Sequence, residues 1–227
     1  ALGRAMRPFF NLVQTLASRV DEVEYRMFRL TEEQLTGLEM LEEEPRVVCL
    51  GGAGTGKTVF AVEIARRLAA DHDRVVLTCQ NPVLASFLRS RLEGEEGVEV
   101  IPFAELDRLR RPADVLIVDE AQDVLDSDGL AIVDQAVEGG LRGGRWRIFL
   151  DPNIQAAFSK RYDPEVLARL KEDGVTAWLK KNCRNTSDVV TNIQLMTGAD
   201  LGVATLGPGP GVDTVVYRSV EEAADLA

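Results

Sequence analysis

The segment from Gly51 to Thr58, which reads GGAGTGKT, constrains the fold of this 227-residue chain more than any other feature. A short apolar run, Val47–Leu50, precedes it directly, and a stretch with apolar residues at helical spacing follows it. A continuous apolar run of this length is typical of a buried strand in a parallel sheet. Because glycines allow the backbone to turn sharply, we expect a strand, a tight loop and a helix in direct succession.

The same segment fits the pattern G-x-x-x-x-G-K-[ST], in which the backbone N–H groups of the loop point inward at phosphate oxygens. The start of the helix adds the positive end of the helix dipole. Lys57 would neutralise the β- and γ-phosphates of a nucleoside triphosphate, and the hydroxyl of Thr58 would bind Mg²⁺. The predicted phosphate-binding residues are Gly52, Ala53, Gly54, Thr55, Gly56, Lys57 and Thr58.

Two acidic residues follow a second apolar run, Val115–Val118. A strand here would place Asp119 at the carboxyl edge of a parallel sheet, where ligands of open α/β folds bind. Asp119 would then hold Mg²⁺, and Glu120 would orient the attacking water and accept its proton. A lone pair of acids is more typical of a solvated turn, but its combination with the glycine-rich loop favours catalysis. The two motifs together predict a nucleoside triphosphatase.

Apolar runs and helical patterns alternate through the chain, which predicts a three-layer α/β domain with a parallel sheet. Glycines at 139–144 predict a loop, and the run GPGPG at 207–211 predicts a linker. We expect a helical connector over 1–29, the main domain over 30–205, and a linker with the start of a second, truncated domain over 206–227. The other predicted strands are 75–77, 98–101, 147–150 and 176–179, and the predicted helices include 82–92, 130–137, 164–171 and 187–196.

Composition narrows the range of partners. The chain has 26 Lys and Arg residues against 37 Asp and Glu residues, a net charge of −11. A protein that grips DNA along a broad track of phosphates needs a basic face, and in this chain such a face could only be local. Cys49, Cys79 and Cys183 lie far apart, which fits neither a zinc site nor a disulfide framework. With no secretory signal and no long apolar run, we expect a cytoplasmic protein without a membrane span.

The acidic motif reads DEAQD over Asp119–Asp123 and, together with four other segments, resembles the superfamily 1 helicase motors of the UvrD/Rep type. The resemblance implies a P-loop NTPase (RecA-like) domain, with ATP and Mg²⁺ as cofactors and single-stranded DNA as a partner. Leu30–Gln34 resembles the glutamine motif of these motors, which implies that Gln34 reads the edge of adenine. Thr31 and Gln34 also fit a capping box at a helix start, and both interpretations stay open.

Leu77–Asn81 resembles the segment that contacts the single strand in these motors, which implies contacts from Thr78 and Asn81. Family members often have an aromatic residue and a lysine there, whereas this chain has Cys79 and Pro82. Stacking on a base needs an aromatic face, so the usual platform is missing at this point.

Phe149–Gln155 resembles the motif that follows the next strand, which implies that Gln155 senses the γ-phosphate. An ordinary surface-loop amide is the alternative for Gln155. Phe158, just beyond, is a candidate for stacking on bases.

Leu179–Thr186 resembles the fourth motif of these motors, which implies that Arg184 reaches the γ-phosphate as charge gathers in the transition state. An ordinary arginine at a helix start is the alternative. Close family members stack adenine between a tyrosine and an arginine, and Cys183 and Val59 stand at those places here.

The resemblance implies the ATP-binding and hydrolysing core of a DNA helicase or translocase, as a fragment without the second motor domain. The motifs at Phe149–Gln155 and Leu179–Thr186 look most like those of UvrD-type motors that are attached to a nuclease-related domain. Residues 1–29 would then be a connector from that upstream domain. The alternative is an ATP-gated regulatory module that controls a partner nuclease or assembly without translocation. The acidic balance and the missing stacking residues favour that alternative.

Overall fold

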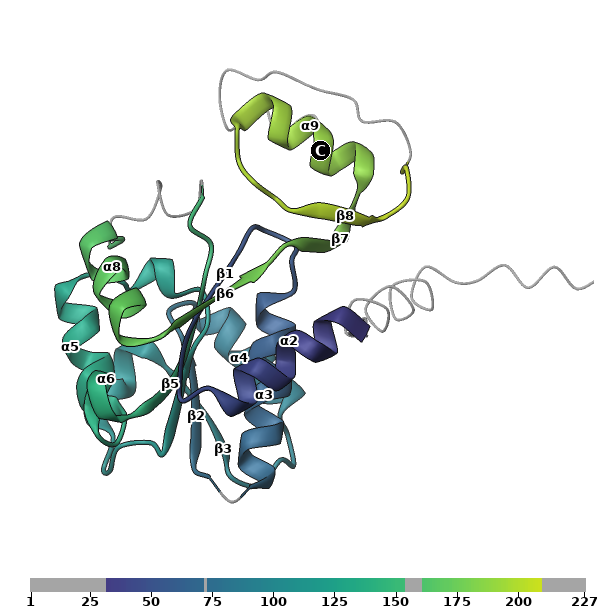
Figure 1. The fold of residues 1–227 in the computed structure, drawn as a ribbon. Coiled ribbons are helices and arrows are strands. Elements are labelled where there is room, and N and C mark those ends of the chain that lie inside the picture. The colour runs from purple at the N-terminus through teal and green to yellow at the C-terminus, as the bar shows by residue number, and fades with distance from the viewer. Residues whose placement is uncertain (1–31, 72, 154–160, 210–227) are drawn as a thin grey trace, which may run out of the picture.

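The computed structural model of the chain describes residues 32–71, 73–153 and 161–209 (Figure 1). Its centre is a six-stranded sheet in the order β3–β2–β4–β5–β1–β6, in which every neighbouring pair is parallel. This arrangement confirms the predicted α/β class and the parallel sheet. The strands are β1 (Arg46–Gly51), β2 (Val75–Cys79), β3 (Val98–Pro102), β4 (Val115–Val118), β5 (Arg145–Leu150) and β6 (Val175–Leu179).

Helices cover both faces of this sheet and make it the middle of three layers, as Figure 1 shows. Side chains alternate along each strand, so Val47 and Cys49 join one core while Val48 and Leu50 join the other. Burial on both faces explains why β1, β2 and β4, in the interior of the sheet, consist mainly of continuous apolar runs. One face carries α2 (Glu32–Glu43), α3 (Lys57–Ala70) and α4 (Pro82–Arg91), and the other carries α5 (Ser127–Ala136), α6 (Gly140–Gly143) and α8 (Pro164–Asp173). The short 3₁₀ helix η1 (Phe103–Arg108) follows β3 in the connection to β4, and η2 (Ala121–Asp123) lies between β4 and α5.

A smaller unit follows β6, and we call residues 181–206 the small lobe. It consists of β7 (Lys181–Thr186), α9 (Ser187–Thr197) and β8 (Val203–Leu206), and the two strands pair in parallel apart from the main sheet. Figure 1 shows it beyond the end of the six-stranded sheet. The sequence predicts α9 but neither strand, because KNCRNT has no apolar alternation and VATL is short.

The glycine-rich segment 139–144 differs from its prediction as a plain loop, because it contains the short helix α6. The N–H of Leu141 donates a hydrogen bond of 2.8 Å to Asp134 Oδ1, and the Leu141 side chain is buried. These contacts come from α5, so a local glycine pattern does not reveal them. Residues 1–29, 210 and 211 lie outside the described residues, and the predicted domain boundaries stay predictions.

None of the helices that the structure describes has both the length and the apolar character needed to cross a membrane.

A buried arginine fixes the end of α2 to the sheet. Arg147 has no exposed surface, and its guanidinium donates hydrogen bonds to the carbonyl oxygens of Leu41, Glu42 and Pro45. Burial lowers the pKa of Arg147 to about 10, which still leaves it charged at neutral pH. A positive group at a helix C-terminus also satisfies carbonyls that lack partners within the helix.

Replacing this side chain should destabilise the fold strongly. We expect Arg147→Ala to lower the free energy of unfolding by roughly 3 kcal/mol, because several buried carbonyls lose their donor together. Arg142 is exposed on α6, so Arg142→Ala is the matched control and should change stability by less than about 0.5 kcal/mol. Urea unfolding of both variants measures the difference, and equal midpoints would contradict the structural role of Arg147.

Candidate functional site

The segment Gly51–Thr58, which we call the phosphate loop, connects β1 to α3. Gly54 and Gly56 adopt φ angles of +86° and +91°, which residues with a Cβ atom rarely adopt. The loop also bonds to itself: Lys57 Nζ donates to the carbonyl oxygens of Gly51 and Gly52 at 2.9 and 3.2 Å. Lys57 is only 5% exposed. The predicted strand–loop–helix unit is therefore present, with the lysine ammonium held inside the loop.

Asp119 lies at the end of β4, beside this loop. Thr58 Oγ1 donates a hydrogen bond of 2.8 Å to Asp119 Oδ2, so the two predicted metal ligands are in contact. Asp119 is fully buried, and its Oδ1 has no hydrogen-bond partner among the described residues. An orphaned, buried carboxylate oxygen next to a hydroxyl fits Mg²⁺, which prefers oxygen ligands.

Burial, with the neighbouring charge of Glu120 as the second cause, raises the pKa of Asp119 to about 7. The Thr58 hydrogen bond and the charge of Lys57 oppose this rise without cancelling it. Near neutral pH the carboxyl group is therefore poised between its two protonation states. A cation bound there would favour the ionised form.

This shift predicts how stability depends on pH. Between the ordinary pKa of 3.8 and about 7, folded Asp119 holds a proton that the unfolded chain releases, so its contribution to stability falls as pH rises. Asp119→Asn does not titrate, and we expect its stability relative to wild type to rise by about 1 kcal/mol per pH unit between about pH 5 and 7. Thermal unfolding across this range, with EDTA and no nucleotide, measures it. Parallel pH profiles for the two proteins would contradict the shift.

Glu120 adopts a left-handed backbone conformation with φ of +51°, the one non-glycine residue with positive φ in the described part of the chain. Such strain is often found at functional sites. Gln122 Nε2 donates to Glu120 Oε2 at 2.6 Å, and Gln122 Oε1 accepts from the N–H of Asp151 at 3.1 Å. Gln122 thus holds the Glu120 carboxylate and joins it to the end of β5. Its type and position in the sequence do not predict this role.

A small cavity of about 70 Å³ brings the predicted catalytic residues together. It joins the phosphate loop to Glu120 from the end of β4 and to Arg184 from β7. Its lining residues are Ala53, Gly54, Gly56, Lys57, Thr58, Val59, Glu120 and Arg184. The structure therefore unites three of the four predicted catalytic residues, although they come from three separate parts of the sequence.

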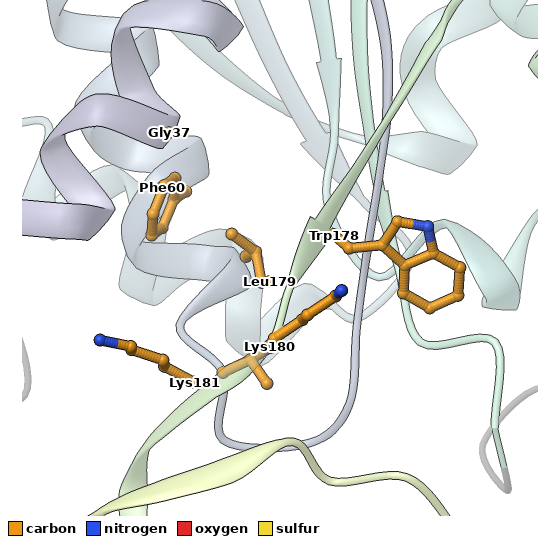
Figure 2. A pocket seen from close by; sticks show the side chains of 7 residues that line it. Gly37, Phe60, Trp178, Leu179, Lys180 and Lys181 are labelled. Atoms are coloured by element: carbon orange, nitrogen blue, oxygen red, sulfur yellow. The ribbon is translucent and has the colours of Figure 1, made fainter.

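A second, larger cavity of about 320 Å³ adjoins the phosphate loop at Thr55. Figure 2 shows Phe60 and Leu179 on the same side of β6, whereas Trp178 points away on the other side. The ammonium groups of Lys180 and Lys181 point in different directions from the strand end. The lining residues are Gly37, Thr55, Phe60, Trp178, Leu179, Lys180 and Lys181, and the lining is mostly apolar.

The predicted nucleic-acid contacts are less well supported. Thr78 is fully buried within β2, so its side chain cannot reach a bound strand in this structure, and that prediction is corrected. The side chain of Asn81 caps α4, because its Oδ1 accepts from the N–H groups of Val83 and Leu84 at 2.9 and 3.3 Å.

Gln34 lies near the start of α2, and its two interpretations, a contact with adenine and a capping box, stay open. Gln155 and Phe158 lie outside the described residues.

Residues 46–140 match the family model described as the Schlafen group 3 DNA/RNA helicase domain. The matched stretch is shorter than half of the chain and includes the phosphate loop and the pair Asp119 and Glu120. A search among curated proteins found no match.

Several solved structures are similar at low identity. Domain III of the replication initiation protein DnaA from Thermotoga maritima is 14% identical, with a TM-score of 0.45 over 77% of this chain and 74% of that chain. AMPPCP-bound DnaA from Aquifex aeolicus is also 14% identical, with a TM-score of 0.41 over 84% of this chain and 55% of that chain. Bacteroides Pif1 bound to ssDNA is 13% identical, with a TM-score of 0.47 over 74% of this chain and 45% of that chain. This chain thus spans about half the length of the latter two.

The parallel sheet and the phosphate loop give the main domain the α/β fold of a P-loop NTPase. The match over residues 46–140 supports a helicase-like domain of this fold. It is not specific for the UvrD/Rep type.

Proposed function

We propose that this chain binds ATP with Mg²⁺ and hydrolyses it. The observation that carries the proposal is the small cavity in which Lys57, Glu120 and Arg184 meet. A positive group on either side of the γ-phosphate and a carboxylate facing it are what phosphoryl transfer to water requires.

Each residue has a distinct part in this proposal. Lys57 and Arg184 neutralise the charge that develops on the phosphate oxygens. The Lys57 ammonium is already held in the loop by the carbonyl oxygens of Gly51 and Gly52. Glu120 orients the attacking water and takes its proton, with Gln122 fixing its carboxylate. Thr58 and Asp119 would hold Mg²⁺, which would supply a further positive charge at the phosphates.

The larger cavity is our proposed site for the nucleotide base. It adjoins the phosphate loop at Thr55, and Phe60 and Leu179 give it the apolar walls that suit the faces of a purine. It would serve in place of the aromatic stack that Val59 and Cys183 do not provide.

Filling this cavity tests the proposal. Gly37 lines it, and a Cβ atom there would meet Phe60 Cε1 at 3.7 Å, an ordinary contact. We expect Gly37→Leu to weaken ATP binding about tenfold by occupying the space of the base, while inorganic triphosphate binds as it does to wild type. Gly37→Ala is the control, and neither change harms α2, since leucine and alanine favour helices. If Gly37→Leu changed the affinities for ATP and for triphosphate equally, the loss would not come from the base, and the base would not occupy this cavity.

The use of hydrolysis is a separate part of the proposal. We propose a helicase or translocase motor core of the UvrD/Rep type that acts on single-stranded DNA in the cytoplasm, connected to a nuclease-related domain. The match over residues 46–140 and the motif resemblances support a helicase-like motor. The burial of Thr78 and the net charge of −11 favour the other candidate, an ATP-gated switch that does not translocate.

Stimulation by DNA separates the two candidates. The measurement is ATP turnover by the full-length protein that contains this chain, with and without single-stranded DNA. A motor is expected to gain about tenfold or more in turnover, which corresponds to about 1.4 kcal/mol of coupling. Turnover that ignores DNA, yet disappears in Glu120→Gln, would favour the switch.

A further inference from the structure

Asn182 in the small lobe is fully buried and uses its whole hydrogen-bonding capacity. Its Nδ2 donates to the carbonyl oxygen of Ala53 in the phosphate loop at 2.8 Å and to that of Leu201 at 3.0 Å. Its Oδ1 accepts from the backbone N–H groups of Arg184 and Asn185 at 3.3 and 2.9 Å. One amide group therefore joins the phosphate loop, the segment before β8 and the part of β7 that carries Arg184.

Other contacts make the same connection tight. The N–H of Cys183 donates to the carbonyl oxygen of Gly54 at 3.0 Å. A Cβ atom on Gly54 would lie 2.7 Å from Asn182 Oδ1, and one on Gly52 would lie 2.4 Å from the carbonyl oxygen of Asp200. Two glycines of the loop are thus needed for contact with the small lobe, and not for phosphate alone. The phosphate loop and the small lobe are therefore in direct contact, with no room for a Cβ atom at Gly52 or Gly54.

We infer that Asn182 is a positioning residue, which holds the part of β7 that carries Arg184 at a fixed place relative to the phosphate loop. This inference rests on the proposed function, because Arg184 can meet a γ-phosphate only if the chain binds ATP. An exposed arginine side chain has many rotamers, so fixing its backbone increases the time that its guanidinium spends at the phosphate. Asn182 itself touches no phosphate in this account and acts through Arg184.

The ratio of affinities for a non-hydrolysable ATP analogue and for ADP reports this role. Wild type should prefer the analogue, because Arg184 meets the γ-phosphate. We expect Arg184→Ala and Asn182→Ala each to reduce this preference about tenfold, as expected for a hydrogen bond to a charged group, and the double variant to reduce it no further. Asn192→Ala is the matched control, because the Asn192 side chain donates to the Asp188 carbonyl within α9 at 2.8 Å. Asn192 makes no contact with the phosphate loop among the residues that the structure describes, and the preference should be unchanged.

The outcomes are distinguishable. If Asn182→Ala lowers the melting temperature but keeps the preference, or if the two losses add, Asn182 is merely structural and the inference is wrong. Should Asn182→Ala fail to fold, Asn182→Ser keeps an oxygen that can accept from the N–H groups of Arg184 and Asn185. It loses the bond to Ala53 and should show the same lost preference. A wild-type chain that binds neither nucleotide overturns the proposed function and, with it, this inference. A wild type that binds both equally overturns the inference and the role of Arg184 alone.

Discussion

Glu120→Gln should bind ATP like the wild type and hydrolyse it about a hundredfold more slowly or worse, the loss expected when a general base is removed. Glutamine has nearly the same size and can still accept the 2.6 Å hydrogen bond from Gln122, so the site should keep its shape. It tolerates the left-handed backbone at this position, with φ of +51°, as well as glutamate does. What it cannot do is take a proton from water.

Phosphate release and ATP binding, measured on the same preparation, separate these effects. Glu138 is exposed and does not line the cavity, so Glu138→Gln controls for the loss of one negative charge. Unchanged turnover in Glu120→Gln would mean that another group activates the water, and lost binding would mean that Glu120 holds the nucleotide itself.

Gly54→Ala should damage both the phosphate loop and its contact with the small lobe. The new methyl group would lie 2.7 Å from Asn182 Oδ1, on a backbone with φ of +86°. Strain alone costs about 1–2 kcal/mol, and the collision adds to it, because Asn182 is fully buried and bonded on all sides. We expect at least a tenfold loss of ATP affinity, on the order of 1.4 kcal/mol or more.

A second glycine separates strain from collision. Gly94 has φ of +85°, and a Cβ atom there would meet nothing within 4 Å. Gly94→Ala should therefore destabilise the fold by the strain alone and leave ATP affinity unchanged. Equal effects of the two substitutions on ATP affinity, measured by calorimetry, would contradict the close packing of loop and lobe.

The sequence predicts the main sheet well because each strand carries its own signal. Strands in the interior of the sheet are buried on both faces and therefore contain continuous apolar runs such as Val115–Val118. The glycines of the phosphate loop stand directly between a strand and a helix, where the backbone has to turn sharply. Lys57 and Glu120 converge because the parallel strands β1 and β4 end at the same edge of the sheet. Arg184 comes from the small lobe, and its place in the cavity is expected only from the resemblance of Leu179–Thr186 to the fourth motif.

The remaining features depend on contacts between distant segments. Thr78 looks like a polar residue available for binding, yet it is buried between β3 and β4, which a single residue type does not reveal. β7 has a polar sequence and becomes a strand by pairing with β8. Gln122 lies within DEAQD and Asn182 within Leu179–Thr186, but neither motif indicates their partners. Their importance comes from contacts with Asp151 and Ala53, which are distant in the sequence.

Calorimetric titration of the wild-type chain and of Lys57→Ala with ATP and Mg²⁺ tests whether ATP binds at the phosphate loop. Lys57 is enclosed by the phosphate loop and bonded to the Gly51 and Gly52 carbonyls, so its removal takes the positive charge from the centre of the site. We expect one ATP bound per wild-type chain and at least about a hundredfold weaker binding by Lys57→Ala, near 2.7 kcal/mol. Wild-type protein that does not bind ATP, or a Lys57→Ala variant that binds it equally well, would contradict this expectation.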